Sequence, residues 1–329
     1  MHVTAAPPRP AGSARPSRSS RSRRNARRRA LRQAGAGVAV LAIATVGVVL
    51  LLQQTTPQAP LRQECTADLD GTAWRLSPAQ ADNAALITAV SVRRGMPARA
   101  ATIALATALQ ESRLINIDHG DRDSVGLFQQ RTSQGWGSVA EIMDPVYSTN
   151  AFFDGLETVA GYTELPVTEA AQAVQRSAFP DAYAQHEMRS RAWASALTGQ
   201  SRAAVSCTLA PAQPLADDAG VAAARSALAA RVARDLGDLT VTDDGPSSVL
   251  VDVAPLAAPQ DTARLAWALA QWGVASATAT GVESVTVAGQ MWSRVDGAWS
   301  PAPASPETTG GEGDPTLAES SVRFTFAVR

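Results

Sequence analysis

The stretch that decides the fold is IALATALQESRLINIDHGDRDSVGLFQQ, residues 103–130. An apolar run ends at Glu111-Ser112, a polar connector follows, and the stretch closes with Gly126-Leu127-Phe128-Gln129. Residues 100–109 are apolar except for two threonines, a pattern typical of a helix buried in a core. Glu111 then lies in the last turn of that helix, where apolar neighbours and the negative end of the helix dipole both favour a protonated carboxyl group. General-acid cleavage of a glycosidic bond requires such a group near neutral pH.

The Glu-Ser pair and the Gly-Leu-Phe-Gln turn, fifteen positions apart, resemble the signature of lysozyme-like lytic transglycosylases. In that family (SLT and goose-type lysozyme-like domains) a Glu-Ser pair precedes a Gly-Leu-Met-Gln turn at the same distance. The resemblance implies a lysozyme-like domain with Glu111 as general acid and base. It also implies that Ser112 orients the acid and that the turn lines the glycan groove. Apart from the resemblance, a tryptophan between two glycines offers a flat apolar ring that could stack on a pyranose or equally pack the loop into the core. The substrate-binding candidates are therefore Ser112, Gly126, Leu127, Phe128, Gln129 and Trp136.

The number of catalytic carboxylates stays open at this point. Lysozymes usually pair the acid with a second carboxylate, and the connector holds three candidates: Asp118, Asp121 and Asp123. Lytic transglycosylases, by the same resemblance, use one glutamate for both proton transfers, and the substrate's own 6-hydroxyl closes an anhydro ring. We favour the mechanism with one acid.

The chain departs from the family pattern in two places. Many members carry Ser-x-x-Gly inside the connector, where this chain has residues 120–123 (GDRD). Members also carry a later Ala-Tyr-Asn-Ala-Gly motif whose tyrosine approaches the acid, and residues 173–177 (AVQRS) contain no tyrosine. Gln175, Arg176 or Tyr183 would have to replace its hydrogen bond. The alternative to an enzyme is therefore a catalytically inactive glycan-binding or structural protein of the cell envelope.

Charge and hydropathy divide the chain near its N-terminus. Residues 1–32 contain ten arginines and no acid, and residues 34–52 contain only Ala, Gly, Val, Leu, Ile and one Thr. Nineteen apolar residues just suffice to cross a hydrocarbon core, so they predict a single-pass transmembrane helix. The positive-inside rule places the arginine-rich tail in the cytoplasm and the remaining domains outside a bacterial cell membrane. Beside such a span, membrane topology explains the arginines more simply than nucleic-acid binding does.

Cys65 and Cys207 are the only cysteines, and they bracket the region that resembles a lysozyme. On the outer side of a membrane such a pair is most simply a disulfide. His119 and His186 are too few and too far apart in sequence for a metal site, so we expect neither a metal nor a cofactor.

The predicted domain order starts with a disordered tail (1–33), a transmembrane helix (34–52) and a linker (53–64). A lysozyme-like all-α domain (65–207), a second linker (208–217) and a small α+β domain (218–329) follow. Capping boxes at Ser77 and Ser138 mark helix starts in the all-α domain, where no strand is expected. Beyond 218, alternating residues on both sides of 244–246 and of 288–289 predict hairpins. The predicted fold class is therefore mainly α.

The function expected from these observations is cleavage of peptidoglycan glycan strands by a membrane-anchored protein. The C-terminal α+β domain shows no catalytic residues. Its four tryptophans fit a carbohydrate-binding surface or, more commonly, a hydrophobic core; they are Trp267, Trp272, Trp292 and Trp299. This domain is the expected contact for an envelope protein partner.

Overall fold

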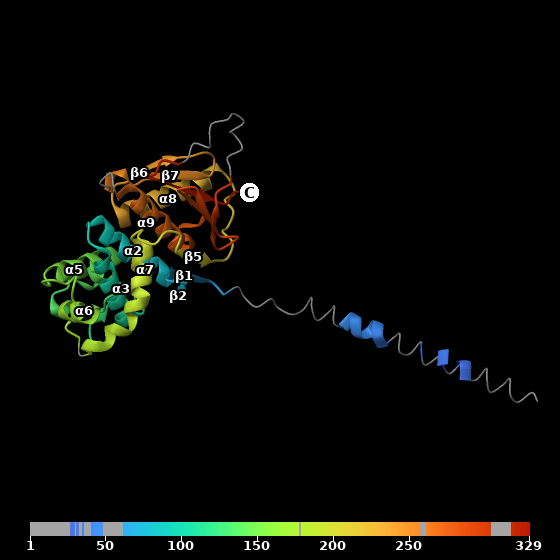
Figure 1. Ribbon diagram of the computed structural model, residues 1–329, viewed down its shortest axis with the longest axis horizontal. Helices are drawn as coiled ribbons and strands as arrows, with labels where there is room; N and C mark the ends of the chain where they lie inside the picture. The colour runs from blue at the N-terminus through green and yellow to red at the C-terminus, as the bar shows by residue number, and fades with distance from the viewer. Residues whose placement is uncertain are drawn as a thin grey trace, which may run out of the picture. The chain divides into compact units, whose positions relative to one another are not determined.

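The computed structural model describes residues 27–29, 31–32, 35, 41–48, 62–177, 179–256, 261–303 and 317–329. The chain divides into two units at Pro60/Leu61. In the first unit, residues 41–48 are helical. The second unit holds every element discussed below, and Figure 1 shows it as a helical part next to a part built on a sheet.

The helical part begins its helices at the predicted capping residues. In α2 (Pro78–Arg93), the Ser77 side chain accepts from Gln80 N, and the Gln80 side chain accepts from Ser77 N. A second capping box starts α4 (Val139–Met143), and the Asp144 side chain caps α5 (Pro145–Glu157). The other helices of this part are α3 (Ala98–Ser112), α6 (Val167–Gln175), α7 (Glu187–Leu197) and the 3-10 helices η1 (Thr132–Gln134) and η2 (Pro180–His186).

Helix α3 forms the centre of the helical part. It packs against α2, α5, α6, α7 and η2, and each of its residues from Ala100 to Leu109 is buried. The helix therefore presents no solvent-facing side until its last turn, as the apolar composition of the run predicts. Glu111 emerges at that end.

The prediction of an all-α domain is wrong because strands frame both ends of the helical part. A three-stranded antiparallel sheet has the order β2-β1-β5, from β1 (Glu64–Leu69), β2 (Thr72–Leu76) and β5 (Val205–Thr208). Asp70 and Gly71 form the two-residue turn between β1 and β2, both with positive φ (54° and 77°). Asp-Gly is a strong hairpin signal that the sequence analysis did not use. A second small hairpin joins β3 (Ser124–Val125) to β4 (Gln130–Arg131).

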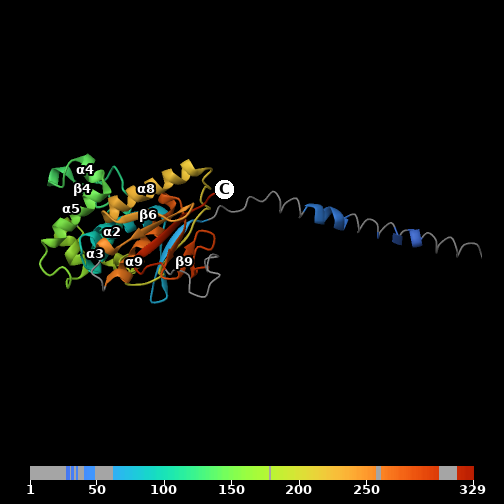
Figure 2. The same ribbon diagram turned by 90° about the horizontal axis from the view of Figure 1, so that it is seen from above.

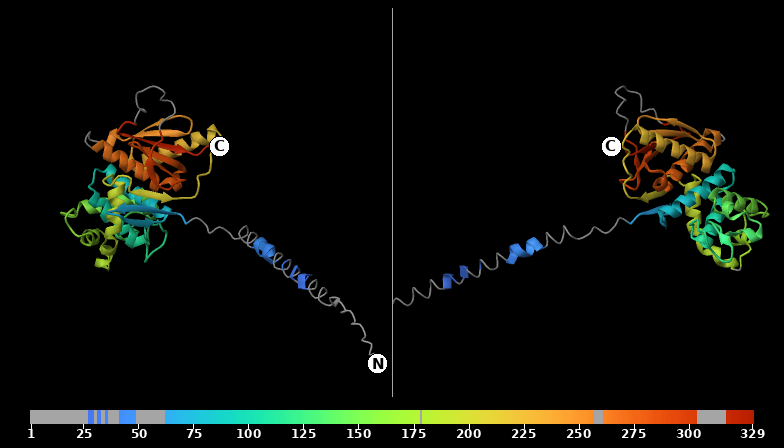
Figure 3. Two further views of the ribbon diagram at one scale, coloured as in Figure 1. Left: turned by 45° about the vertical axis from the view of Figure 1, so that its right-hand side comes forward. Right: turned by 180° about the vertical axis from the view of Figure 1, so that it is seen from behind.

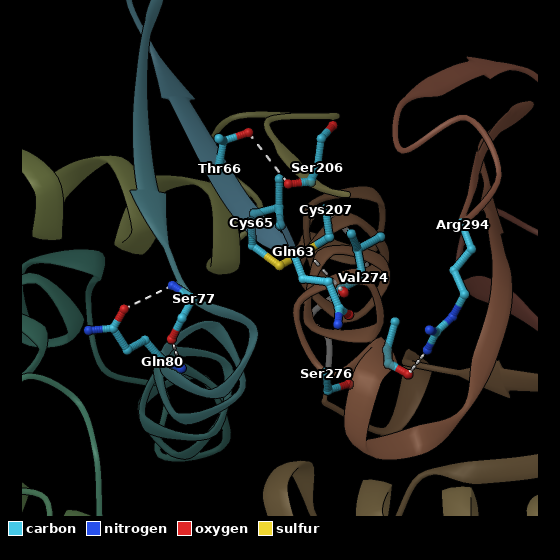
Figure 4. Close-up of a disulfide and its surroundings, with 12 residues drawn as sticks. Gln63, Cys65, Thr66, Ser77, Gln80, Ser206, Cys207, Val274, Ser276 and Arg294 are labelled. Carbon is cyan, nitrogen blue, oxygen red and sulfur yellow. Dashed lines mark hydrogen bonds between the residues drawn. A yellow bond between two sulfur atoms is a disulfide. The ribbon is translucent and has the colours of Figure 1, made fainter. Parts of the chain in front are cut away.

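The predicted disulfide between Cys65 and Cys207 is present. The two cysteines are directly opposite each other on β1 and β5, and both are fully buried. Figure 4 shows the sulfur–sulfur bond beside the cross-strand hydrogen bond from Thr66 Oγ1 to Ser206 O. The bond thus closes the helical part where its first and last strands meet.

The C-terminal part is a six-stranded antiparallel sheet with helices. Its order is β10-β9-β8-β11-β7-β6, so the last strand of the chain lies between two hairpins formed earlier. The two hairpins occur where the sequence predicts them. The elements are α8 (Asp218–Leu236), β6 (Thr240–Asp243), β7 (Ser248–Asp252), η3 (Ala254–Leu256), α9 (Thr262–Ala275), α10 (Ala277–Thr280), β8 (Val282–Val287), β9 (Gln290–Ser293), β10 (Trp299–Pro301) and β11 (Ser321–Phe326).

Helix α9 packs on the sheet at β8 and β11. A Cβ on Gly273 would lie 2.3 Å from the Phe324 ring, so this position tolerates only glycine without a shift of β11. The Trp272 ring meets the same Phe324 ring edge to face, with centroids 6.3 Å apart. Aromatic packing therefore joins this helix to the middle of the sheet.

The helical part and the sheet part share a buried polar contact, and Figures 2 and 3 show the two parts side by side. Arg231 of α8 pairs with Asp82 of α2 (2.7 Å) and with Asp235 (2.8 Å). The fully buried Asp235 also accepts from Arg234 Nε (2.7 Å) and Trp272 Nε1 (3.0 Å). A buried charge network needs such complete pairing, because one missing partner leaves an unsatisfied charge.

The predicted fold class, mainly α with a transmembrane helix, needs two corrections. The described residues contain three sheets, one of them six-stranded, so strands are a major component. Within those residues no helix is long and apolar enough to cross a membrane. The predicted single-pass anchor, and the localisation outside a cell membrane that depended on it, are therefore wrong for the part of the chain that the structure describes. Of 34–52, it describes only residue 35 and the helix 41–48, which is about 12 Å long at 1.5 Å per residue.

The composition of residues 34–52 indicates a preference for a nonpolar environment, but it does not set the length of a helix. A span needs about 20 consecutive helical residues. The rest of the predicted span, most of the tail 1–33 and most of the linker 53–64 lie outside the described residues.

Candidate functional site

Glu111 lies in the last turn of α3, as predicted. The helix ends one residue later, at Ser112, and the next two residues, Arg113 and Leu114, are both in the left-handed conformation (φ 58° and 59°). Their N–H groups donate back to Leu109 O and Ala108 O, so the chain turns away immediately after the acid. Burial raises the pKa of the Glu111 carboxyl, and hydrogen bonds from Tyr183 and Gln175 offset part of that rise.

Tyr183 and Gln175 are the two residues whose hydrogen bonds lower the pKa of Glu111. Tyr183 Oη, on η2, donates to Glu111 Oε1 over 2.6 Å. The Gln175 side chain, at the end of α6, also donates from Nε2 to Phe128 O over 2.8 Å. Burial and the bond to Glu111 raise the pKa of Tyr183, while a hydrogen bond from Ser177 lowers it. The sequence indicated Tyr183 and Gln175 but not Ser177, because a single hydroxyl in a loop has no distinguishing pattern.

Ser112 joins the end of α3 to the Gly126 turn. Its buried hydroxyl lies 2.6 Å from Leu127 O and 3.1 Å from Ala108 O, and both contacts are to backbone oxygens. The motif spacing thus has a structural basis, since the residue after the acid binds the turn fifteen positions later.

The turn itself is tightly packed. Gly126 has φ +82°, and a Cβ there would lie 2.8 Å from Ile142 O, so glycine is required for both conformation and space. Leu127 and Phe128 are fully buried, and the Phe128 ring stacks on Phe152 with centroids 4.6 Å apart. Gln129 is half-buried, and its amide donates to His119 O and Gly126 O (3.3 Å each). Leu127 and Phe128 therefore support the site from the core.

The three connector aspartates do not contact Glu111. Asp118 is exposed and binds His119, which contributes to lowering the pKa of Asp118. Asp121 is exposed. Asp123 accepts from Ser133 N, Ser133 Oγ and Arg131 Nε, and these bonds lower its pKa. Asp123 thus holds the β3–β4 hairpin to η1.

Trp136 and Gln175 line one pocket of about 540 Å³ between the 134–136 loop and the ends of α5 and α6. Gln175, which lines this pocket, is also the link to Glu111, because its side chain contributes a hydrogen bond that lowers the pKa of that carboxyl. Among the residues that the structure describes, no three His, Cys, Asp or Glu side chains gather as a metal ion would require.

The C-terminal tryptophans belong to the core. Trp267, Trp272 and Trp292 are at most 4% exposed. Trp299 is half-buried, and its Nε1 donates to Val205 O over 2.7 Å, across to the strand that carries the disulfide. Of the two interpretations from the sequence, the hydrophobic core is the one that the packing matches.

Neither a scan against protein-family models nor a search of curated proteins found a match to this chain.

Proposed function

We propose that the helical part, residues 65–207, cleaves the bond between N-acetylmuramic acid and N-acetylglucosamine in peptidoglycan. The observation that carries this proposal is the Glu111 carboxyl group. It is half-buried, its pKa is raised by desolvation, and it is oriented by Tyr183 and Gln175 beside a pocket with an indole in its lining. The resemblance of residues 103–130 to lytic transglycosylases supplies the substrate class.

The reaction would use Glu111 twice. The protonated carboxyl first gives its proton to the glycosidic oxygen, and the bond from C1 to that oxygen breaks. The resulting carboxylate then takes the proton of the 6-hydroxyl of the same muramic residue, whose oxygen bonds to C1. The products are a 1,6-anhydro end and a new 4-hydroxyl end, and the acid is regenerated without consumption of water.

Two features favour this route over hydrolysis by an acid and a second carboxylate. Asp123, the connector aspartate with the lowered pKa, is occupied by Arg131 and Ser133. Tyr183 donates to the carboxylate and so stabilises the form that must act as the base.

The test is digestion of purified peptidoglycan by the full chain, with products identified by mass spectrometry. Anhydro-muropeptides that disappear in Glu111→Gln are the expected result. Glu169→Gln on α6, an exposed glutamate with no hydrogen-bond or ion-pair partner among the described residues, is the matched control and should retain activity. Reducing-end products would instead indicate hydrolysis. Sedimentation with peptidoglycan without release of products would indicate a binding protein, and absence of both would reject a glycan substrate.

A further inference from the structure

The pocket that Gln175 lines has one fixed aromatic wall. Tyr147 Oη donates to Trp136 O (3.3 Å), which holds the backbone of the loop. A Cβ on Gly155 of α5 would lie 3.7 Å from Trp136 Cη2, so the ring packs over the end of that helix. The side chain is half-buried, and the part that lines the pocket provides a flat apolar surface suited to a pyranose ring.

The same pocket contains a positive charge without an acidic partner. Arg176 follows α6 in the left-handed conformation (φ 53°), and its N–H donates to Gln172 O. Arg176 is exposed and lines the pocket, and its guanidinium forms no ion pair among the described residues. The nearby acids of α5, Asp154 and Glu157, are both bound by Arg94 at 2.7 Å. A guanidinium in this position can bind a carboxylate through two parallel hydrogen bonds.

Arg176 directly follows Gln175 in the chain. Gln175 also lines the pocket, and its side chain contributes to lowering the pKa of Glu111 by a hydrogen bond. A sugar stacked on Trp136 would therefore have its substituents near Arg176. The glycosidic bond to the next sugar would then lie toward Glu111.

We infer that the Trp136–Arg176 pocket is a subsite for a sugar that carries a carboxylate, and that it selects acidic glycans over neutral ones of the same backbone. The ring would stack on the Trp136 indole, and the carboxylate of the sugar's side group would pair with the Arg176 guanidinium. This inference rests on the proposed function, since it names the substrate class of the same site. In peptidoglycan the acidic group would be the lactyl-peptide substituent of muramic acid.

The test measures binding of two disaccharide probes, N-acetylglucosaminyl-muramyl dipeptide and the neutral N-acetylglucosamine dimer, by calorimetry. The full chain carries Glu111→Gln so that neither probe is cleaved. We expect tighter binding of the acidic disaccharide. Arg176→Gln should weaken that binding by about ten- to a hundredfold, the range for loss of a charge-assisted hydrogen bond. Binding of the neutral dimer should change less than about twofold, because its contact with the indole remains.

Two further variants control the measurement. Arg176→Lys has the same left-handed backbone position and keeps the charge, so it should retain part of the selectivity that Arg176→Gln loses. Arg202→Gln removes an equally exposed arginine outside the pocket lining and should change nothing. Equal binding of the two probes, binding of neither, or selectivity unchanged in Arg176→Gln would each overturn the inference. Arginine-dependent selectivity in a chain that releases no anhydro-muropeptides would uphold the subsite and reject the proposed cleavage.

Discussion

Replacing Gln271 with leucine should destabilise the helical part of the protein, although Gln271 belongs to α9 in the sheet part. Its side chain is fully buried and forms four hydrogen bonds. Oε1 accepts from Ala204 N (2.8 Å) and Val205 N (2.9 Å), and Nε2 donates to Ala196 O (2.6 Å) and Ser201 O (2.9 Å). One amide thus satisfies the backbone between the end of α7 and the start of β5.

The magnitude follows from the groups that leucine would leave unpaired. Ala196 O keeps a second donor, Gly199 N at 2.9 Å, so it contributes little. Val205 is fully buried, so leaving its N–H unpaired would cost about 2 kcal/mol of folding free energy. Ala204 N and Ser201 O belong to half-buried residues that water can reach. The loss of each of their hydrogen bonds would cost about 1 kcal/mol of folding free energy. Leucine has a similar volume, so no large cavity adds to the total of about 4 kcal/mol.

The assay is urea unfolding of the full chain with the disulfide intact, followed by tryptophan fluorescence. Gln271→Leu should lower the free energy of unfolding by about 4 kcal/mol without a change in the denaturant slope. Gln200→Leu, an exposed glutamine in the same connection with no side-chain hydrogen bond among the described residues, is the control and should change it by less than about 0.5 kcal/mol. A loss below about 1 kcal/mol for Gln271→Leu would refute the reasoning, because it would mean that the backbone finds other partners.

Three further outcomes are expected. Tyr183→Phe removes a hydrogen bond that lowers the pKa of Glu111, so that pKa should rise. The alkaline limb of the pH–rate profile for peptidoglycan cleavage should then move to higher pH. An unchanged limb would contradict the role of Tyr183. The pKa of Glu111 is higher in the folded chain than its unfolded value near 4.5. Above the folded pKa the buried carboxylate therefore lowers the free energy of unfolding, whereas below about pH 4.5 the group is protonated in both states and has no such effect. Glu111→Gln should therefore raise the melting temperature at pH 7, with a gain that vanishes on acidification through the folded pKa; a pH-independent change would argue against burial as the cause. Gly126→Ala should lower the free energy of unfolding by about 2 kcal/mol more than Gly71→Ala. Both glycines have positive φ, but only a Cβ at position 126 would meet a neighbouring atom, Ile142 O, at 2.8 Å. Equal losses would show that backbone strain alone matters.

Local signals in the sequence predicted the helices of the site well. The capping box at Ser77 and the apolar run 100–109 depend on neighbours within one or two turns, and both occur as predicted. The two cysteines predicted their own pairing because there was no other partner. The spacing from Glu111 to Gly126 corresponds to one contact in the structure, the hydrogen bond from Ser112 Oγ to Leu127 O.

The misses share a different physical basis. β1 became a strand because β5 pairs with it from the other end of the helical part, and no local pattern records a partner so distant in the chain. The membrane prediction is wrong for the described residues, because an apolar composition indicates a preference for burial but does not set the length of a helix. In both cases the sequence was interpreted one segment at a time.

The sequence by itself determined the position of the acid, its apolar helix, the glycine that follows and the covalent closure of the helical part. These depend on short-range propensity, side-chain chemistry and the absence of alternatives. Only the tertiary structure decided which side chains meet the acid: Tyr183 comes from η2 and Gln175 from α6, seventy-two and sixty-four positions beyond Glu111. It also placed Arg176 and Trp136 on one pocket. Packing of helices brings such residues together, and packing depends on all the elements at once.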